Sequence, residues 1–520
     1  MSREFNITGT CIPHKHFMAD TSEKLEQITE LIDKGHYFTI NRPRQYGKTT
    51  TMYLLEEKLK KSDYYIIRIS FEGIGDSPFE NEKRFSKTFI SQLIGEFKFL
   101  KDKRILDYIE KNNTVCNDLK ELSLFITDLV QEIGKRIVLM IDEVDKSSNN
   151  QLFLSFLGIL RTKYLLRKED RDYTFHSIIL AGVHDVKTLK LKIRDGKEEK
   201  FNSPWNIAID FDIDMSFNPK EIATMLVDYT RETQVKMDIP EIAGKLYYYT
   251  SGYPFLVSRL CKIIDEKILV NKTEKKWEEN DITQAVNIML GESNTNFDSL
   301  IKNLENNEDL YANAYDIVIE GASKTFNNDN PVIKSGEMYG IFRDEGIVKI
   351  HNRIYEQRIY NYMSSKIETS MNIDSYSYRE NFIKNRKLDF EKLLVKFQLF
   401  MKEQYNEKDE KFLERNGRLI FLAFLKPIIN GYGYDFKEVQ ISEEKRLDVV
   451  VTFYSSKYVV ELKLWKGDKA HKKGLKQLSG YLDRQNLSQG YLVIFNKNKK
   501  KAWKQAKETV DGKNVFAIWV

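Results

Sequence analysis

The sequence predicts an α/β protein with two separate α/β domains, and three observations lead to this prediction. Residues 37–40 are a short β-prone apolar run, and residues 50–61 have the spacing of an amphipathic helix. Residues 136–146 read as an apolar strand that ends in two acids. From about residue 385 the pattern becomes helix, strand, strand, helix and strand. We therefore expect one α/β domain at the front of the chain and another at the back.

Length and composition fit a soluble globular protein. A chain of 520 residues is enough for about three domains, and 41% hydrophobic with 31% charged residues is a globular balance. The sequence has no apolar run of about 18 residues and no basic-then-apolar signal pattern at its start. Its three cysteines are far apart and form no CxxC pair. We expect no membrane partner, no disulfide framework, and a cytoplasmic setting.

The net charge of +5 conceals an uneven distribution. Residues 381–520 carry 29 Lys and Arg against 17 Asp and Glu, a net charge of +12, which leaves −7 on the remaining 380 residues. A basic C-terminal third suggests a polyanionic partner. A lysine-rich solvated surface explains the same charge equally well, so charge alone leaves both readings open.

The stretch NRPRQYGKTTT, residues 41–51, differs in one position from the phosphate-binding pattern G-x-x-x-x-G-K-[ST]. Gly47, Lys48 and Thr49 match, whereas Arg42 stands at the first glycine. Because the loop lies between a strand and a helix, backbone N–H groups at the helix start can hold phosphates. Lys48 would contact the β and γ oxygens, and Thr49 would bind Mg²⁺. The expected ATP-binding residues of this loop are Arg44, Gly47, Lys48, Thr49 and Thr50.

A second signature lies about 95 residues further on, in RIVLMIDEVDK, residues 136–146. The strand would deliver Asp142 to the sheet edge, where it can hold Mg²⁺ through water, and Glu143 can polarise the attacking water. A strand that merely ends in an acidic turn is the alternative. Two motifs in this order favour ATP binding.

Further residues around this site are candidates for phosphate sensing. A third strand ends directly before His184. ATPases with an inserted central strand have a polar residue at this position that senses the γ-phosphate. An ordinary loop histidine explains His184 equally well. Residues 247–268 read as a turn and a lid helix, in which Arg259 is either a sensor or an exposed helix arginine. Arg161 and Arg194 are candidate arginine fingers, and one sequence selects neither.

Several stretches together resemble the AAA-like ATPases of bacteria and archaea over about residues 5–365. They are FNITGTCIPHKHFMAD, YFTINRPRQYGKTTT, ISFEG, SIILAGVHDVKTLK, NSPWNIAIDF and YTSGYPFLVSRLCK. This family often carries an RP-R-[QF]-x-GKT loop, so Arg42 and Pro43 match it. The resemblance implies a P-loop fold of the ASCE type with a helical lid, ATP and Mg²⁺ as cofactors and, in many members, a C-terminal nuclease.

The expected domain boundaries follow the changes of pattern. A helix, two short strands and a helix in residues 337–366 read as winged-helix-like. The expected parts are a P-loop ATPase core at 1–235, a helical lid at 236–300, a winged-helix-like segment at 301–366, a linker at 367–384 and a second α/β domain at 385–520.

The C-terminal region contains Asp448 and, thirteen residues later, Glu461-Leu462-Lys463. Antiparallel pairing of their strands can bring the two carboxylates together, and the two-residue period puts Glu461 and Lys463 on one face. Two carboxylates at one point bind a hard cation such as Mg²⁺, and the metal with Lys463 can activate water and stabilise a pentavalent phosphorane. An ordinary charged hairpin is the alternative, because D…ExK is short and common.

The surroundings of this triplet favour a catalytic site. Valines flank both acids, which indicates that both strands belong to the core. A charged side chain on a core strand is costly unless it is paired or binds a metal. Gln477 and Tyr481 lie four apart on one helical face and match the Q-x-x-x-Y element of PD-(D/E)XK nucleases, while Glu414 matches their additional metal ligand. Residues 385–520 thus resemble the PD-(D/E)XK domains fused to AAA-like ATPases, with one departure, Lys-Arg-Leu where Pro or Gly-Arg usually precedes Asp448.

We expect a cytoplasmic ATPase–nuclease in which ATP regulates, or drives loading of, a metal-dependent phosphodiesterase. Mg²⁺ is the expected metal, with Mn²⁺ as an alternative at the nuclease site, and DNA is favoured over RNA. Defence against phage or mobile elements rests on the resemblance alone, and a homo-oligomer is left open. The alternatives are a nucleotide-switched nucleic-acid-binding regulator that does not cleave, and a DNA translocase with an accessory nuclease.

The lysines expected to contact phosphates are Lys466, Lys469, Lys472, Lys473 and Lys476, and Lys497, Lys499, Lys500, Lys501 and Lys504.

Overall fold

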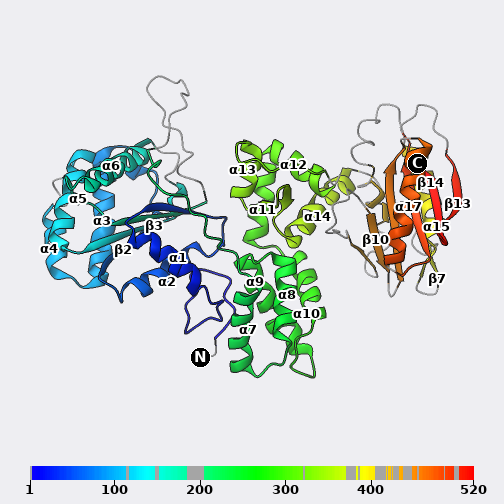
Figure 1. Cartoon of the computed structure of the whole chain (residues 1–520), viewed down its shortest axis with the longest axis horizontal. Coiled ribbons are helices and arrows are strands. Elements are labelled where there is room, and N and C mark those ends of the chain that lie inside the picture. The colour runs from blue at the N-terminus through cyan, green and yellow to red at the C-terminus, as the bar shows by residue number, and fades with distance from the viewer. Residues whose placement is uncertain are drawn as a thin grey trace, which may run out of the picture. The chain divides into compact units, whose positions relative to one another are not determined.

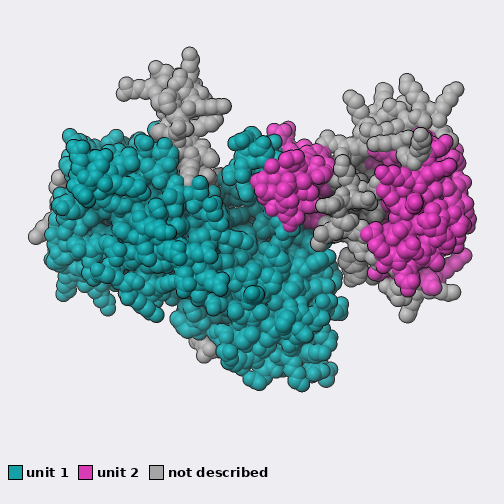
Figure 2. All heavy atoms as spheres, in the orientation of Figure 1, with its two compact units in different colours: residues 1–303, 327–343, 351–355 teal, residues 304–326, 344–350, 356–520 magenta. Residues whose placement is uncertain are grey.

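The structure is a computed structural model of the whole chain and divides into two compact units (Figure 2). The first unit comprises residues 1–303, 327–343 and 351–355, and the second comprises 304–326, 344–350 and 356–520. The structure describes residues 3–112, 116–146, 151–183, 204–319, 322–370, 382–384, 387–404, 417, 420–422, 424–425, 433–436, 448–453, 456–465, 467–484, 486–496 and 503–520.

The first unit is built around a four-stranded parallel sheet with the order β1-β4-β3-β2 (Figure 1). The central strands β3 and β4 are buried along almost their whole length, as parallel strands covered on both faces must be. Since β4 lies between β1 and β3, the expected inserted central strand is confirmed. The strands are β1 (Tyr37–Asn41), β2 (Tyr64–Ser70), β3 (Arg136–Asp142) and β4 (Ser177–Gly182).

Six helices accompany this sheet, and α3 to α6 gather beside it (Figure 1). Aromatic and aliphatic side chains of α3, α5 and α6 form one core with the apolar residues of the strands. The sheet therefore holds its polar strand ends at the rim of a large apolar core. The helices are α1 (Ser22–Asp33), α2 (Lys48–Leu59), α3 (Glu82–Leu100), α4 (Lys103–Asn112), α5 (Leu119–Ile133) and α6 (Gln151–Lys168).

A group of helices follows the sheet in the chain (Figure 1). The first begins with a capping box, in which Asn218 and Glu221 each accept the other's backbone N–H. The turn before α9 requires Gly252, because its φ is +73° and a Cβ there would lie 2.0 Å from the carbonyl oxygen of Phe217. The helices are α7 (Pro219–Thr233), α8 (Ile239–Thr250), α9 (Pro254–Ile263), continued as a π-helix over Ile264–Ile268, and α10 (Glu279–Leu290).

The next elements have the expected order of helix, two short strands and helix. The limits given above for the lid, the winged-helix-like segment and the linker stay predictions, and residues 371–381 of the linker lie outside the described residues. The elements are α11 (Thr295–Glu305), α12 (Glu308–Val318), α13 (Pro331–Met338), β5 (Phe342–Asp344), β6 (Val348–Ile350) and α14 (Arg353–Ser370).

The second unit contains a six-stranded mixed sheet with the order β13-β14-β12-β11-β10-β9. Strands β11, β12 and β14 are parallel, and the pairs at both edges are antiparallel. The elements are β7 (Ile383–Lys384), β8 (Lys387–Leu388), α15 (Phe390–Gln404), β9 (Gly433–Phe436), β10 (Asp448–Phe453), β11 (Ser456–Leu464), α17 (Asp468–Arg484), β12 (Gln489–Phe495), β13 (Gln505–Val510) and β14 (Lys513–Trp519).

Helix α17 connects β11 to the parallel strand β12 and packs on one face of the sheet. Its apolar residues share a core with Val459 of β11 and Ile494 of β12. Because side chains alternate along a strand, Glu461 and Lys463 lie on the same face as Val459, towards α17. Residues 410–430, which include Glu414, lie mostly outside the described residues. No described helix is long and apolar enough to cross a membrane.

Candidate functional site

Gly47 ends the phosphate-binding loop in a conformation that favours glycine. It is the N-cap of α2, with φ of +81°, and its carbonyl accepts the N–H of Thr51 at 2.8 Å. A Cβ on Gly47 would meet nothing within 4 Å, so the requirement for glycine comes from the backbone angle. The helix thus presents free N–H groups and the positive end of its dipole beside the loop.

Arg42 braces the loop from the position where the usual pattern has a glycine. Its guanidinium donates to the carbonyls of Asn41 at 2.9 Å and Ile213 at 2.7 Å, and it lies over the ring of Phe211. Burial lowers the pKa of Arg42. Hydrogen bonds from a charged donor are stronger than neutral ones, so this side chain ties the loop to residues 211–213.

Lys48 is 6% exposed and lies between loop carbonyls and acids. Its Nζ donates to the carbonyls of Arg42 and Pro43, both at 2.9 Å. Burial lowers the pKa of Lys48, and the nearby Asp145, Glu143 and Asp142 act in the opposite direction. A phosphate bound at the start of α2 would compete with the two carbonyls for this ammonium group.

The two acids predicted at the end of β3 lie as the sequence suggested. Asp142 is 6% exposed and accepts the N–H of Glu143 at 2.9 Å. Glu143 has φ of +56°, an uncommon value for a residue other than glycine. Burial raises the pKa of Glu143, neighbouring acids raise it further, and Lys48 lowers it. A carboxyl group held in this way is suited to act as a base.

Asp145 is a residue of this site that the sequence analysis did not single out. Both of its carboxylate oxygens lie 2.7 Å from the N–H of Val183, directly after β4. A Cβ on Gly182 would lie 2.8 Å from Asp145 Oδ1, so only glycine leaves room for the carboxylate. The short D-E-V-D spacing, which returns a third acid to the sheet edge, could have revealed it.

The structure does not place all of the predicted loop and sensor residues at the site. Thr50 accepts the N–H of Cys11 at 3.0 Å through Oγ1, and Arg44 is exposed. Arg259 forms an ion pair with Glu292. His184 and the finger candidate Arg194 lie outside the described residues. Thr49 is half-buried at the start of α2, and the other finger candidate, Arg161, is half-buried in α6.

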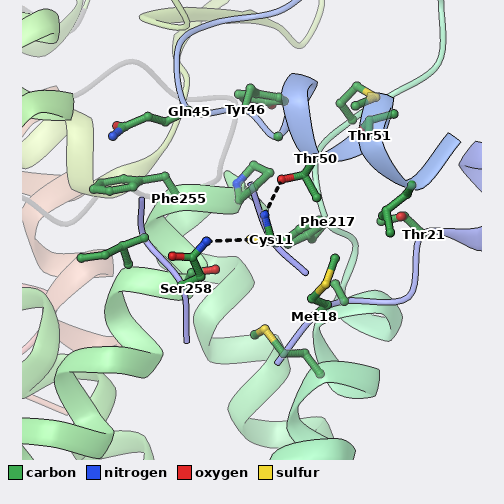
Figure 3. A pocket seen from close by; sticks show the side chains of 18 of the residues that line it. Cys11, Met18, Thr21, Gln45, Tyr46, Thr50, Thr51, Phe217, Phe255 and Ser258 are labelled. Atoms are coloured by element: carbon green, nitrogen blue, oxygen red, sulfur yellow. Dashed lines mark hydrogen bonds between the residues drawn. The ribbon is translucent and has the colours of Figure 1, made fainter. Parts of the chain in front are cut away.

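A cavity of about 320 Å³ opens beside the loop (Figure 3). Its walls come from the N-terminal segment, the loop with the start of α2, and helices α7 and α9, and they are mainly apolar. This volume is in the range of small-molecule sites. These residues could not be selected from the sequence, because the walls come from segments about 200 residues apart. The lining includes Ile7, Thr8, Gly9, Cys11, Phe17, Gln45, Tyr46, Thr50, Leu54, Met215, Phe217, Met225, Pro254, Phe255 and Ser258.

In the second unit, the strand register pairs Asp448 of β10 with Glu461 of β11. Residues directly opposite each other in antiparallel strands have Cβ atoms about 4.5–5.5 Å apart. Glu461 is 2% exposed, and its Oε1 lies 3.0 Å from Lys463 Nζ. The side chains of Asp448 and Glu414 lie outside the described part of the chain. Among the described residues no cluster of three or more potential metal ligands occurs.

Helix α17 completes this arrangement. Lys463 Nζ donates to Gln477 Oε1 at 3.0 Å, so the predicted Gln477 joins Glu461 and Lys463. Gly474, which the sequence analysis did not select, lies directly against Lys463. Tyr481 is 2% exposed in the core beneath α17, and its hydroxyl has no hydrogen-bond partner among the described residues.

Part of the predicted basic surface is described. Lys472, Lys473 and Lys476 are exposed on α17. Lys504 is exposed and lies 4.3 Å over the ring of Trp519. The other predicted phosphate contacts, or their side chains, lie outside the described residues, namely Lys466, Lys469, Lys497, Lys499, Lys500 and Lys501.

Comparison with known proteins gives two family matches and several distant relatives. The AAA-like domain family matches residues 14–360, and the restriction endonuclease family matches residues 418–518. An uncharacterized WD repeat-containing protein of Synechocystis is 22% identical over 302 residues, which are 52% of this chain and 24% of that protein. The chain thus matches only about a quarter of that relative's length.

Solved structures resemble the chain weakly. The Walker-type ATPase of Pyrococcus abyssi has a TM-score of 0.47 at 14% identity and covers 68% of this chain and 99% of its own. The ORC1 protein of Aeropyrum pernix in complex with DNA has a TM-score of 0.29 at 12% identity, with 67% and 94% covered. The RuvB branch migration motor of Thermotoga maritima has a TM-score of 0.33 at 12% identity, with 65% and 94% covered.

The AAA-like match covers more than half of the chain, and the second match confirms the nuclease fold expected at the back. The expected combination of an AAA-like domain with a restriction endonuclease domain is therefore present in this chain. The chain belongs to the AAA-like domain family of P-loop ATPases and carries a restriction endonuclease domain in its C-terminal region.

Proposed function

We propose that nucleotide in the first unit regulates, or drives loading of, metal-dependent cleavage of nucleic acid in the second. The observation that carries cleavage is the set of contacts around Lys463, which lies 3.0 Å from both Glu461 and Gln477. Burying a charge is costly unless it is paired, and Glu461, which is 2% exposed, pairs with Lys463 at the register position opposite Asp448. A buried acid in contact with a lysine on a core strand supports a catalytic use of these residues.

The residues of the first unit fit ATP. The triphosphate would lie at the start of α2, where Gly47 shapes the loop and Lys48 supplies a positive charge. The adenine base of ATP would enter the apolar cavity beside the loop (Figure 3). Thr49 and Asp142 would hold Mg²⁺, and Glu143 would orient and deprotonate the attacking water. Asp145 would keep the end of β4 in place beneath these acids.

Cleavage in the second unit is a hydrolysis of the phosphodiester bond. A water oxygen bonds to phosphorus, the bridging P–O bond breaks, and the departing oxygen is protonated. Lys463 would stabilise the negative charge that develops on the phosphoryl oxygens, and Gln477 would hold its ammonium group in place. Glu461, Asp448 and Glu414 would bind Mg²⁺ or Mn²⁺, which supplies Lewis acidity and an activated water.

Double-stranded or single-stranded DNA is the proposed substrate, in preference to RNA. The exposed lysines of α17 support a nucleic-acid partner because they can contact phosphates without reading sequence. We further propose a cytoplasmic protein with a role in defence against phage or mobile elements, in which several copies can assemble.

Two other functions use the same residues. A nucleotide-switched regulator would bind nucleic acid without cutting it, and the intact Glu461–Lys463–Gln477 contacts argue against this role. A translocase with an accessory nuclease would show ATP hydrolysis that rises strongly with the length of the DNA.

The test is cleavage of DNA and RNA by the full chain with Mg²⁺ or Mn²⁺, with and without ATP. Lys463→Ala and Asp448→Ala are expected to abolish cleavage, whereas the matched control Lys457→Ala, at the exposed start of the same strand, should cleave like wild type. Lys48→Ala should remove only the effect of ATP. Equal cleavage by wild type and Lys463→Ala would refute the nuclease site, and an ATP effect that persists in Lys48→Ala would refute regulation through the P-loop.

A further inference from the structure

Tyr46, the residue before Gly47, is fixed by contacts that phosphate binding does not explain. It is 4% exposed, and its hydroxyl lies 2.6 Å from Ser216 Oγ and 3.1 Å from His351 Nε2. Its ring meets those of Tyr253 and His351 edge-on, with centroids 4.6 Å and 5.8 Å apart. The side chain is thus held by a residue about 300 positions later in the chain.

The backbone on the other side of the loop is held in the same way. The carbonyl of Arg44 accepts the hydroxyl of Tyr253 at 2.5 Å. The ring of Pro43 packs against Gly340, where a Cβ would lie 2.7 Å from it. Together with the contacts of Tyr46, this fixes three of the four loop positions before Gly47 from outside the loop.

The hydrogen bonds of His351 define which atoms donate. Its Nδ1 lies 3.4 Å from Asn352 Nδ2, an amide nitrogen that can only donate. Nδ1 therefore accepts, Nε2–H donates to Tyr46 Oη, and the Tyr46 hydroxyl donates to Ser216 Oγ, an assignment inferred from the network. This arrangement requires neutral His351.

We propose that His351 is a positioning residue for nucleotide binding at the P-loop and that it acts through Tyr46. The proposal rests on the nucleotide site proposed above. A loop that is already held in shape loses less conformational freedom when the phosphates bind, and affinity rises with the fraction of molecules in the competent conformation. His351 also directly precedes Asn352, which accepts the N–H of Tyr355 at the start of α14, so the loop and the start of that helix are fixed together.

The test is equilibrium binding of a fluorescent ATP analogue to the full chain, with thermal unfolding measured alongside. Tyr46→Phe, which keeps the ring, and His351→Ala should each weaken binding about tenfold. The double variant should bind no more weakly than either single variant, because both changes remove the same contact. His351→Gln, whose side-chain amide can still donate to Tyr46, should bind within about threefold of wild type. The exposed His14→Gln is the matched control and should bind like wild type.

Lys48→Ala distinguishes a failure of the positioning role of His351 from a failure of the proposed nucleotide site. If Lys48→Ala loses binding while Tyr46→Phe and His351→Ala bind like His14→Gln, the positioning role is wrong and the nucleotide site stands. If the two changes add in the double variant, His351 does not act through Tyr46. If Lys48→Ala binds as tightly as wild type, the nucleotide site itself is wrong and the inference falls with it. Where His351→Ala fails to fold, weaker binding by Tyr46→Phe together with wild-type binding by Ser216→Ala, both at an unchanged unfolding temperature, supports the proposal, because Ser216 is the other partner of the Tyr46 hydroxyl.

Discussion

Gly474 of α17 lies directly against Lys463 of β11, so that a Cβ on Gly474 would lie 3.1 Å from Lys463 Cδ and 3.3 Å from its Nζ. The missing side chain lets the helix approach the strand closely enough for Gln477 to accept a hydrogen bond from Lys463. The position of the ammonium group in the proposed nuclease site therefore depends on a residue without a side chain.

Replacing Gly474 by alanine should separate activity from stability. Alanine favours a helix over glycine by about 1 kcal/mol, so the unfolding temperature should stay or rise. The added methyl group must move the Lys463 side chain by a few tenths of an ångström, and a small misplacement of a catalytic group lowers the rate. Cleavage rates should fall about threefold to tenfold. Gly480→Ala on the same helix, where a Cβ meets nothing within 4 Å, should leave cleavage unchanged. Equal rates for both variants would show that the close approach does not position Lys463.

Metal binding at Glu461 should be visible without any cleavage assay. Ligands that bind only the folded state raise its stability, so Mn²⁺ should raise the unfolding temperature of the wild-type chain by about 5 °C. Glu461→Gln should lose this shift, because a neutral amide binds a hard cation poorly. Asp483→Asn, an exposed change on α17, should keep it. An undiminished shift in Glu461→Gln would place the metal elsewhere.

His351 should make the stability of the first unit depend on pH. Burial, with Arg343 acting in the same direction and Asp214 against it, lowers the pKa of His351 from 6.5 to about 4. Between these values the unfolded chain binds a proton that the folded chain does not, so the free energy of unfolding falls as the pH decreases through this window. The loss should reach about 3 kcal/mol at about pH 4.

Comparison with His351→Gln isolates this effect from the titration of carboxylates. Urea unfolding at several pH values between about 7 and 4 should give a smaller loss of stability for the variant than for wild type. Parallel curves for the two proteins would show that His351 has its ordinary pKa when folded.

The fold could be predicted from the sequence where patterns are local. The strand–loop–helix at Lys48 and the apolar strand ending at Asp142 both appear where they were expected. The hairpin of β13 and β14 was missed, although its Asp511-Gly512 turn is a standard hairpin signal. Periodic apolar residues and turn residues act over a few positions, so they can be read without the structure.

The site was predicted only as far as its motifs extend. Glu461 and Lys463 lie on one face of β11 as expected, because side chains alternate along a strand, and Gln477 of α17 contacts Lys463. Tyr46 and its contact with His351 could not be predicted, since packing between segments about 300 residues apart leaves no local pattern. Neither could the role of Arg42 as a brace.

Replacing Arg42 by the glycine of the usual pattern should lower the stability of the loop and weaken nucleotide binding. Arg42→Gly removes the guanidinium that joins the loop to residues 211–213, and it leaves the carbonyls of Asn41 and Ile213 without this donor. Hydrogen bonds to charged groups contribute about 1.5–3 kcal/mol each, and glycine adds backbone freedom. Thermal unfolding should show a loss of stability, and ATP-analogue binding should weaken about tenfold.

Lys61→Gly, an exposed change in the turn after α2, is the control for the introduction of a glycine. If Arg42→Gly binds the analogue as tightly as wild type at the same unfolding temperature, Arg42 is a neutral replacement of the glycine and the brace has no role in holding nucleotide.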